Sequence, residues 1–425
     1  MMKAKEGKAK EARLPLSGLV VADFGHTVMG PCAGMVLSDL GAEVIKVEPA
    51  PQGDNTRYLK GFGAGYFGYF NRGKRSLAVN LKTPEGLRAA ESLISRADVL
   101  IENFGPNTME RLGLGWERAR DLNPRLIYAS LKGFLSGPYE NRLALDEVVQ
   151  MMTGLAYMTG PSGRPLRAGT SVVDIMGGIF AVIGILLALR ERDETGRGRF
   201  VQSALFESTV FLMGQHLAYA AQSDGPIPPM PERVSAWAVY ETFTLKDGSQ
   251  FFVGITSDNH WLRFCEFLKR DDLLADPEFG TNNDRIAARP RLIPIISEIF
   301  ASLDVDQATS LCETARLPFA PVRRPEELFD DPHLAATDGL LPTRLPGGIA
   351  TKLPRLPLVV DGFSFSAPSA PPGVGDDTYD VLRELGLSDE AIFGMLESGA
   401  AAYSGDMPGR RSQPHEEKRG IGEEQ

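Results

Sequence analysis

The feature that most constrains this chain is a regular alternation of strand-like and helix-like segments between residues 19 and 131. The strand-like segments are short apolar runs such as LVVADF and EVIKVE, and residues such as Pro31 and Gly41 mark helix starts and stops between them. Strands are predicted at residues 19–24, 43–48, 76–80, 99–102 and 126–131, with helices from Pro31 onward, at 84–96 and at 107–122. Alternation at this spacing predicts an α/β fold built on a doubly wound parallel sheet.

Doubly wound sheets bind their ligands beyond the carboxyl ends of the strands. The loop after the first predicted strand, GHTVMGP, lacks the G-x-G-x-x-G spacing of a dinucleotide site. We still expect the loops that follow the strands to gather at one edge of the sheet. These loops are residues 25–30, 49–56, 103–106 and 133–142.

Residues 169–189 (GTSVVDIMGGIFAVIGILLAL) place one carboxylate, Asp174, just before an uncharged apolar run. The run is shorter than the roughly 18–20 residues that cross a bilayer, so a buried core helix is predicted. An Asp before a helix commonly accepts hydrogen bonds from the free N–H groups of the first turn, and spacing alone favours this capping role. The alternative is a chemical role for a carboxylate that the helix dipole keeps ionised.

At 425 residues the chain is long enough for two or more domains. A Pro- and Gly-rich stretch at 223–231 separates the α/β pattern from a predicted hairpin (239–244 and 251–255) and helices (259–269 and 290–303). The predicted organisation is a disordered arm (1–14), a large domain (15–222 and 341–402), a smaller α+β domain with its linkers (223–340) and a disordered tail (403–425). In the large domain we also predict a strand at 199–204, a helix at 206–222, an extended return path at 341–372 and helices at 378–387 and 388–398.

Composition narrows the class of function. A net charge of −10 argues against nucleic acid as a partner. Three widely separated cysteines fit neither a disulfide framework nor a metal site, and the charged first fourteen residues lack the apolar core of a signal peptide. No histidine pairs with a cysteine or another histidine at ligand spacing, so no metal is expected. We therefore expect a cytoplasmic protein without a membrane segment.

Several other motifs leave alternatives open. The basic cluster formed by Arg72, Lys74, Arg75 and Lys82 fits a phosphate site and a solvated surface equally well. His26, in the first loop, is more readily structural than functional, and the glycine-rich GFGAGYFG stretch fits a flexible connector. No Walker A motif and no G-x-S-x-G elbow occur. Any nucleophilic chemistry must therefore rest on a carboxylate, which can form a covalent acyl intermediate.

Several blocks, in order, resemble the class III CoA-transferases, the CaiB/BaiF-like family of formyl-CoA transferase and crotonobetainyl-CoA:carnitine CoA-transferase. The blocks are PLSGLVVADF (15–24), GAEVIKVEP (41–49), NRGKRSLAVNLKTPEG (71–86), ENFGPNTMERLGL (102–114), NPRLIYASLKGF (123–134), VVQMMTGLAYMTG (148–160) and ETGRGR (194–199). The similarity spans residues 16–401. The resemblance implies an interlocked homodimer, with acyl-CoA and a small carboxylic acid as substrates and no permanently bound cofactor.

The family's catalytic aspartate matches Asp174, within GTSVVDIMGG. The resemblance implies that this carboxylate forms an anhydride with the acyl group and then a thioester with CoA, with succinyl-CoA as one candidate donor. A helix start would offer N–H groups to the developing oxyanion. The implied CoA contacts are Val28, Met29, Asn80, Lys82, Asn103, Phe104, Arg111, Leu145 and Asp146.

The sequence also departs from the family pattern. Val28 and Leu145 stand where formyl-CoA transferase has Gln and Tyr, and that enzyme's glycine-rich loop is absent, which argues against oxalate and for a larger or less polar acyl group. The related 2-methylacyl-CoA racemases are the main alternative, but their catalytic histidine falls on Leu145, and one-for-one α-proton exchange needs that second base. A CoA-binding protein without catalytic activity is a third interpretation.

Overall fold

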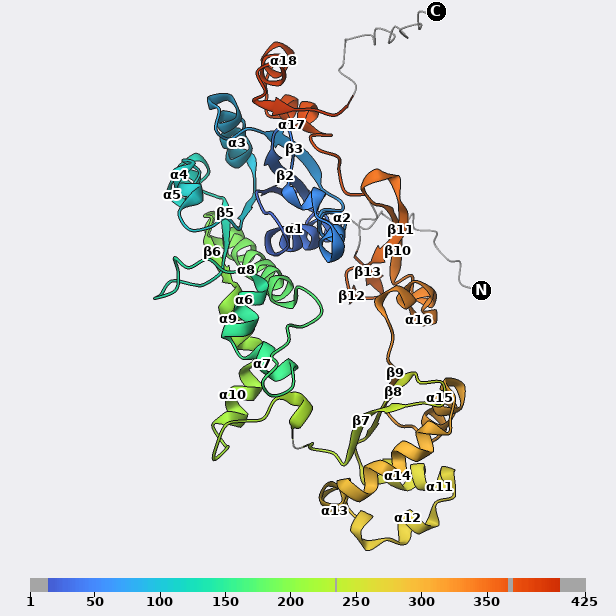
Figure 1. The fold of residues 1–425 in the computed structure, drawn as a ribbon. Coiled ribbons are helices and arrows are strands. Elements are labelled where there is room, and N and C mark those ends of the chain that lie inside the picture. Colours follow the sequence, from blue (N-terminus) through green and yellow to red (C-terminus); the bar gives the residue numbers. More distant parts are fainter. Residues whose placement is uncertain (1–13, 234, 366–369, 406–425) are drawn as a thin grey trace, which may run out of the picture. The chain divides into compact units, whose positions relative to one another are not determined.

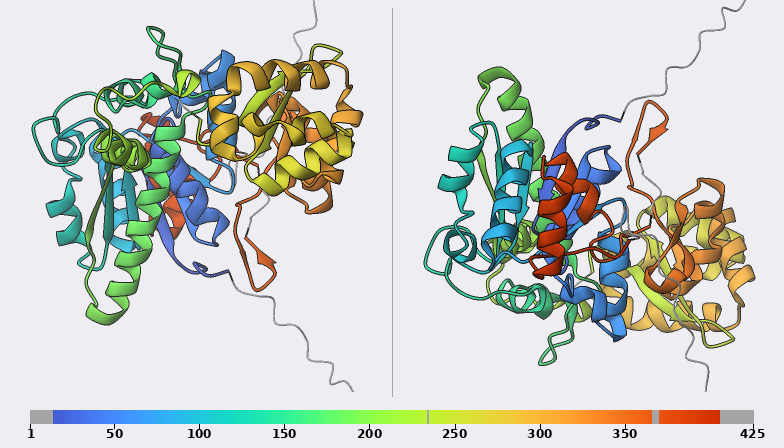
Figure 2. Two further views of the ribbon diagram at one scale, coloured as in Figure 1. Left: turned by 90° about the horizontal axis from the view of Figure 1, so that it is seen from below. Right: turned by 90° about the horizontal axis from the view of Figure 1, so that it is seen from above.

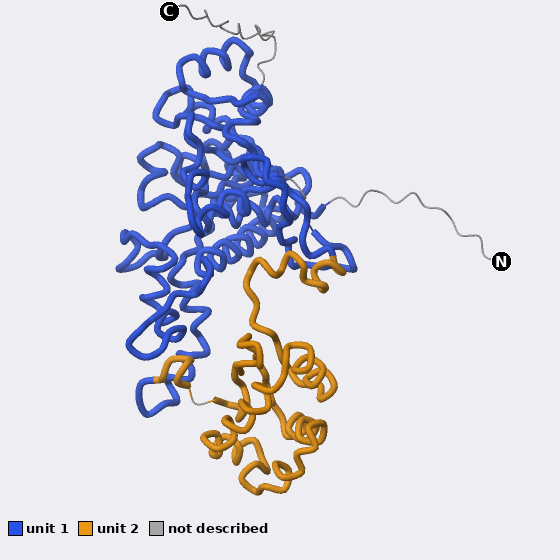
Figure 3. Tube along the Cα trace, turned by 45° about the vertical axis from the view of Figure 1, so that its right-hand side comes forward, with its two compact units in different colours: residues 1–226, 338–425 blue, residues 227–337 orange. Residues whose placement is uncertain are grey.

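The computed structural model describes residues 14–233, 235–365 and 370–405. The chain forms two compact units, residues 1–226 with 338–425 and residues 227–337 (Figure 3). The sequence places these boundaries at 222/223 and 340/341. The disordered arm and tail predicted at 1–14 and 403–425 lie outside the described residues, apart from residues 14 and 403–405.

A seven-stranded sheet organises the larger unit, in the order β14-β3-β2-β1-β4-β5-β6 (Figure 1). Its strands are β1 (Val20–Asp23), β2 (Glu43–Pro49), β3 (Arg75–Val79), β4 (Val99–Glu102), β5 (Ile127–Lys132), β6 (Phe200–Ala204) and β14 (Ala401–Ala402). β1 to β6 pair in parallel, and β14 is antiparallel to β3. The predicted doubly wound parallel sheet is confirmed. The strand order reverses between β1 and β4. At this switch point of the sheet the loops diverge and leave room for a ligand.

Helices cover both faces of this sheet because successive strand residues point to opposite sides. Val21, Val44 and Ile127 pack toward α1 (Met29–Asp39) and α8 (Val172–Thr195), and the two helices lie side by side (Figure 2). On the other face, alternate residues such as Ala22 and Leu100 pack toward α3 (Pro84–Arg96), α17 (Thr378–Glu384) and α18 (Asp389–Glu397). Both faces are therefore buried, as a parallel sheet requires.

The remaining helical segments of this unit are shorter. They are η1 (Asn55–Tyr58), η2 (Gly61–Gly65), α2 (Tyr66–Phe70), α4 (Thr108–Arg111), α5 (Trp116–Leu122), α6 (Asp146–Met152), α7 (Leu155–Thr159), α9 (Leu205–Leu212), α10 (Gly214–Ala220) and η6 (Pro346–Gly348). The single helix predicted at 107–122 is wrong: the chain breaks at Gly113, whose φ is +74°, and restarts as α5. The helix predicted at 206–222 likewise divides at Met213, and the GFGAG stretch is a 3₁₀ turn.

The predicted extended path at 341–372 is also wrong within the described residues. Most of it forms two short hairpins, β10 (Leu340–Arg344) with β11 (Ala350–Pro354) and β12 (Val359–Val360) with β13 (Phe363–Ser364). Gly347 and Gly348, with φ near +82° and +81°, form the turn of the first hairpin. Glycine is favoured at two consecutive positions of positive φ, so the Gly-Gly pair in the sequence marks this turn.

The smaller unit has its own sheet and core. Its strands are β7 (Val239–Thr244), β8 (Gln250–Ile255) and β9 (Phe319–Pro321), and β7 and β8 form the predicted hairpin. Its helical segments are η3 (Met230–Glu232), α11 (Asp258–Leu268), α12 (Asp271–Ala275), η4 (Pro277–Phe279), α13 (Asn282–Ala287), α14 (Arg289–Ala301), α15 (Val305–Thr314), η5 (Pro325–Asp330) and α16 (Pro332–Ala336). Its centre contains Phe251, Phe264 and Phe300, which are fully buried.

α8 is only partly a core helix. By length and composition it is the one helix in the described part of the chain that could cross a membrane, and 44% of its most apolar window is buried. Its inner side packs closely on α1, since a Cβ at Gly178 would lie 2.8 Å from the carbonyl oxygen of Met29. Its outer side carries exposed Ile183 and Leu187. The predicted core helix is therefore buried on its inner side, against α1 and the sheet, and exposed on its outer side within the single chain.

Candidate active site

Two adjoining cavities lie at the carboxyl ends of the parallel strands. The larger, of about 510 Å³, is lined by the loops that follow β1, β2, β3 and β4. The smaller, of about 240 Å³, is lined by the loops after β1, β4 and β5 and by Asp174 of α8. The two cavities share His26, Thr27 and Phe104. The predicted gathering of these loops at one edge of the sheet is confirmed.

Reciprocal hydrogen bonds fix the loops at the switch point. The His26 backbone N–H donates to Asn103 Oδ1 at 2.8 Å, and Asn103 Nδ2 donates to the His26 carbonyl at 2.9 Å. The His26 ring lies 5.4 Å from that of Phe104, between centroids, and its Nδ1 contacts Thr27 Oγ1 at 2.9 Å. Thr27 has a φ of +65°, an uncommon conformation that this clamp holds in place. The wall common to both cavities is therefore rigidly built.

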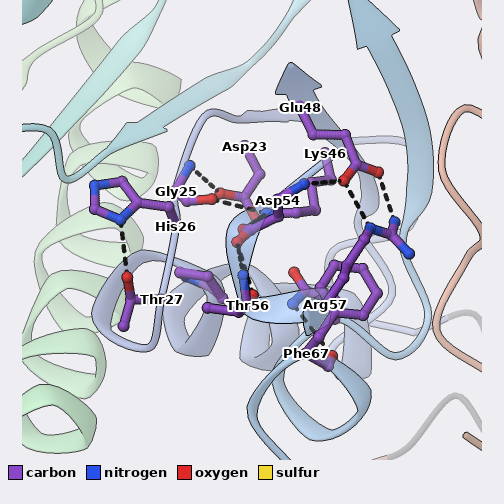
Figure 4. A network of polar contacts seen from close by, with 12 residues as sticks. Asp23, Gly25, His26, Thr27, Lys46, Glu48, Asp54, Thr56, Arg57 and Phe67 are labelled. Carbon is purple, nitrogen blue, oxygen red and sulfur yellow. Dashed lines mark hydrogen bonds and ion pairs between the residues drawn. The ribbon is translucent and has the colours of Figure 1, made fainter. Parts of the chain in front are cut away.

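A buried ionic network contributes to the wall of the larger cavity (Figure 4). Lys46 Nζ donates to the Gly25 carbonyl and to Asp54 Oδ2, both at 2.8 Å, and so joins the first loop to the second. Asp54 also accepts bonds from the backbone and hydroxyl of Thr56, at 2.8 and 2.7 Å. The Lys46 side chain is 1% exposed. Its charge is therefore committed to holding the two loops together.

Glu48 extends this network toward the C-terminal segment. Its carboxylate accepts a backbone bond from Asp54 at 2.7 Å and bonds from Arg57 at 2.9 and 2.6 Å. The Arg57 guanidinium lies over the Phe67 ring, 3.6 Å from its centroid, and donates to the Pro372 carbonyl. Residues far apart in the sequence thus stabilise one wall of the cavity.

The basic cluster is mostly structural. Arg72 and Lys74 form neither a phosphate site nor a solvated surface, because both are buried in ion pairs. Lys74 is buried and donates to Asp23 Oδ2 at 2.7 Å, and Arg72 is buried against Asp39 at 2.7 Å. Arg75 pairs with Glu43 and Glu384. Lys82 lines the larger cavity and is exposed.

The carboxylate that caps α8 is Asp146, the first residue of α6. Its Oδ2 accepts from the backbone N–H groups of Val173 and Asp174, at 2.8 and 3.2 Å. Its Oδ1 accepts from Gln150 Nε2 at 2.5 Å and lies 3.7 Å from Arg167 Nη2. The capping role that spacing favours for Asp174 is therefore filled by a residue of another helix. It also follows that these two N–H groups are not available to a developing oxyanion, contrary to our expectation.

Asp174 stands in the first turn of α8 with its carboxylate at the smaller cavity. Burial raises the pKa of Asp174 from 3.8 to about 7, the neighbouring Asp146 carboxylate adds to the rise, and Arg167 opposes it. Burial and the like charge of Asp146 favour the protonated form of Asp174, contrary to the expectation that this group is kept ionised. A carboxyl group with a pKa near neutrality is characteristic of a reactive site.

The structure places most of the sequence-predicted site residues at the cavities. Met29, Asn103, Phe104, Leu145 and Asp146 line the smaller one with Asp174, and Asn80 and Lys82 line the larger one with Phe104. Two lie elsewhere. Val28 is completely buried within the first loop, and Arg111 is exposed and folds back on Pro106 and Thr108.

His26 is the residue that sequence reasoning undervalued. It lines both cavities, and burial lowers the pKa of its imidazole, which favours the neutral form. Its position directly after the first strand was the available signal, since that loop reaches the switch point. No group of His, Cys, Asp and Glu residues in the described part of the chain could hold a metal ion.

The fold and the site define a class of protein: an α/β enzyme with a ligand cavity at the switch point of a doubly wound sheet and a buried carboxyl group beside it. The chain belongs to CoA-transferase family III, whose model matches residues 16–378. It is therefore a CoA-transferase.

Individual relatives support this assignment. The chain is 35% identical to an acyl-CoA transferase of Fusarium pseudograminearum, over 92% of this chain and 89% of that protein. It is 33% identical to the succinate–glutarate CoA-transferase of Agrobacterium fabrum, over 87% and 96%. The crystal structure of a CAIB/BAIF family protein from Brucella suis superposes with a TM-score of 0.79 at 31% identity, covering 88% of this chain and all of that one.

Proposed function

We propose that this enzyme moves CoA from an acyl-CoA thioester to an acceptor carboxylic acid, with Asp174 as the nucleophile. The observation that carries the proposal is the Asp174 carboxyl group, which faces a cavity at the switch point with its pKa raised to about 7. A carboxylate of raised pKa is more nucleophilic than an ordinary one and is still half ionised near neutral pH.

The proposed reaction has four covalent steps. The Asp174 carboxylate attacks the donor thioester carbonyl, forming a mixed anhydride and releasing CoA thiolate. The thiolate attacks the aspartyl carbonyl of the anhydride, giving an aspartyl-CoA thioester and the free donor acid. The acceptor carboxylate attacks this thioester, forming a second anhydride and releasing CoA thiolate again, and the thiolate then attacks the acceptor carbonyl of that anhydride. Product acyl-CoA leaves and the Asp174 carboxylate is restored.

The two cavities suit the two ends of an acyl-CoA. The larger, with Asn80 and the exposed Lys82 on its wall, provides room and positive charge for the nucleotide and its phosphates. The smaller is of a size for the thioester and a small acid. The connecting arm of CoA would pass His26 and Phe104, which belong to both cavities.

The acids we propose are small dicarboxylates, with succinyl-CoA as a donor. Support comes from the Agrobacterium fabrum relative, which acts on succinate and glutarate. Because Val28 is buried and lines neither cavity, its difference from the Gln of formyl-CoA transferase would not act on the acid directly. Leu145, which lines the smaller cavity and is 68% exposed, is the difference that bears on the acyl group.

We further propose a cytoplasmic homodimer whose chains interlock, as the family resemblance implies. The outer sides of α8, α9 and α10 carry Leu187, Phe211 and Leu217, which are 67%, 71% and 58% exposed. Large apolar side chains gathered on neighbouring helices are typical of a subunit interface. The three cysteines are buried free thiols, which fits a reducing compartment. Light scattering should give the mass of a dimer for the wild type and a lower mass for a Leu187→Arg variant. A wild type with the mass of a monomer would contradict the dimer.

Exchange of isotope-labelled succinate into succinyl-CoA tests the proposed activity, since it needs only the first half of the reaction and the reversal of that half. Asp174→Ala should abolish exchange, whereas Asp193→Ala, an exposed aspartate of the same helix, should leave it intact. Full exchange by Asp174→Ala would overturn the role of Asp174. Deuterium uptake at the α-carbon without an acceptor would indicate a racemase, and CoA binding without any exchange would indicate a non-catalytic protein.

A further inference from the structure

The loop between β5 and α6 brings an arginine, Arg142, to the wall of the same cavity that holds Asp174. The other cation on this wall is Lys132, whose Nζ donates to Glu102 at 2.7 Å and to the Phe104 carbonyl at 2.8 Å. The charge of Lys132 is thereby neutralised within the protein. Among the described residues that line this cavity, Arg142 is the cation with no carboxylate partner.

The guanidinium of Arg142 is held in place, although it is exposed. It lies over the Tyr139 ring, 4.2 Å from the centroid, and the Arg142 backbone N–H donates to the Tyr139 carbonyl at 2.8 Å. Tyr139 packs with Phe134 and Phe206 at centroid distances of 5.6 and 6.2 Å. The loop is also tied to α9, because the Phe206 N–H donates to the Gly133 carbonyl. Stacking on this cluster reduces the freedom that the arginine would lose on binding a ligand.

The charges around the cavity favour a small anion over a large one. Asp146, Asp174 and Glu140 all line it, so a phosphate chain would meet three carboxylates. Two of these are already engaged: Asp146 caps α8, and Glu140 accepts from Ser136 Oγ at 2.9 Å. An acid whose first carboxylate reacts at Asp174 leaves Arg142 as the group able to bind a second one. A planar guanidinium binds a carboxylate through two parallel hydrogen bonds, which gives both strength and orientation.

We propose that Arg142 is the specificity-determining residue that binds the distal carboxylate of a dicarboxylic acid, both in the free acid and in its CoA half-thioester. This inference rests on the proposed CoA-transfer function and adds the side chain that recognises the second carboxylate of the proposed dicarboxylic acids. Tyr139 acts as a positioning residue for the guanidinium.

Substrates with and without a distal charge test the proposal. Glutarate is compared with butyrate as acceptor, and succinyl-CoA with acetyl-CoA as donor, for wild type, Arg142→Gln and Arg142→Lys. Where an acid turns over slowly, its inhibition constant against the good acceptor gives the same comparison. The control is Arg120→Gln, because Arg120 also lies over an aromatic ring, that of Trp116, but lines neither cavity.

Arg142→Gln should lower kcat/KM for glutarate and succinyl-CoA by roughly 10- to 100-fold, mainly through KM, because a charge-assisted hydrogen bond is lost. Values for butyrate and acetyl-CoA should stay within about twofold, Arg142→Lys should fall between, and Arg120→Gln should match wild type. Equal losses for all substrates, a loss that follows CoA rather than the acyl group, or no loss would overturn the proposal. A wild type that transfers CoA to no acid would instead contradict the proposed function itself.

Discussion

The Asp174 carboxylate should lower the stability of the folded protein at the pH where it is reactive. Burial and Asp146 raise its pKa from 3.8 to about 7. An acid whose pKa is higher in the folded than in the unfolded state stabilises the fold while protonated, and this contribution is lost progressively as pH rises from the unfolded value to the folded value. The difference between the two pKa values corresponds to roughly 4 kcal/mol of unfolding free energy, an upper limit because solvent reaches part of the residue.

Asp174→Asn tests this directly because it removes the charge and keeps the shape. The variant should be more stable than wild type by up to about 4 kcal/mol at pH 8.5 and by about 2 kcal/mol at pH 5.5. Urea denaturation at both pH values and one protein concentration measures the two differences. The variant should also be inactive. Equal stability of the two proteins at both pH values, or a less stable variant at pH 8.5, would refute the reasoning.

Three further predictions concern the Asp174–Asp146 pair, the packing of α8 on α1 and the buried Lys46–Asp54 pair. The value of kcat/KM for the donor should rise with pH to half its maximum near pH 7, as Asp174 ionises. Asp146→Asn should move that midpoint to lower pH, because it removes a like charge. An unmoved midpoint would show that another group controls the rate. Gly178→Val should destabilise the fold by about 1–3 kcal/mol in urea, since its Cβ would crowd the Met29 carbonyl. Lys46→Met should lower the free energy of unfolding by about 3–5 kcal/mol, because the buried Asp54 carboxylate loses its partner. A variant as stable as wild type would show that the buried pair does not stabilise the fold.

The sheet and the placement of its loops could be predicted because they depend on local patterns. LVVADF and EVIKVE carry the apolar residues that a strand buried on both faces needs, and a parallel sheet necessarily brings the carboxyl ends of its strands together. The meeting of the loop that begins at Gly25 with the loop that begins at Asn103 can therefore be predicted without knowing how the side chains pack.

The electrostatics of the site could not be predicted, because they depend on contacts between distant residues. Asp146 caps α8 from another helix, and no local pattern connects it to the N–H group of Val173. In the sequence, Lys74 belongs to a basic cluster that could bind phosphate, but in the folded chain Asp23 neutralises its charge in the core. The pKa of Asp174 likewise follows from burial and from a neighbouring carboxylate, both of which are properties of the folded chain.

The most direct test of the central claim is to trap the covalent intermediate on Asp174. The enzyme is incubated with succinyl-CoA in the absence of an acceptor, treated with hydroxylamine, digested and examined by mass spectrometry. We predict a hydroxamate on the peptide that contains Asp174, loss of activity in proportion to its formation, and no modification without the thioester. An enzyme that turns over fully while its Asp174 peptide stays unmodified, or that carries the modification on another residue, would contradict the mechanism.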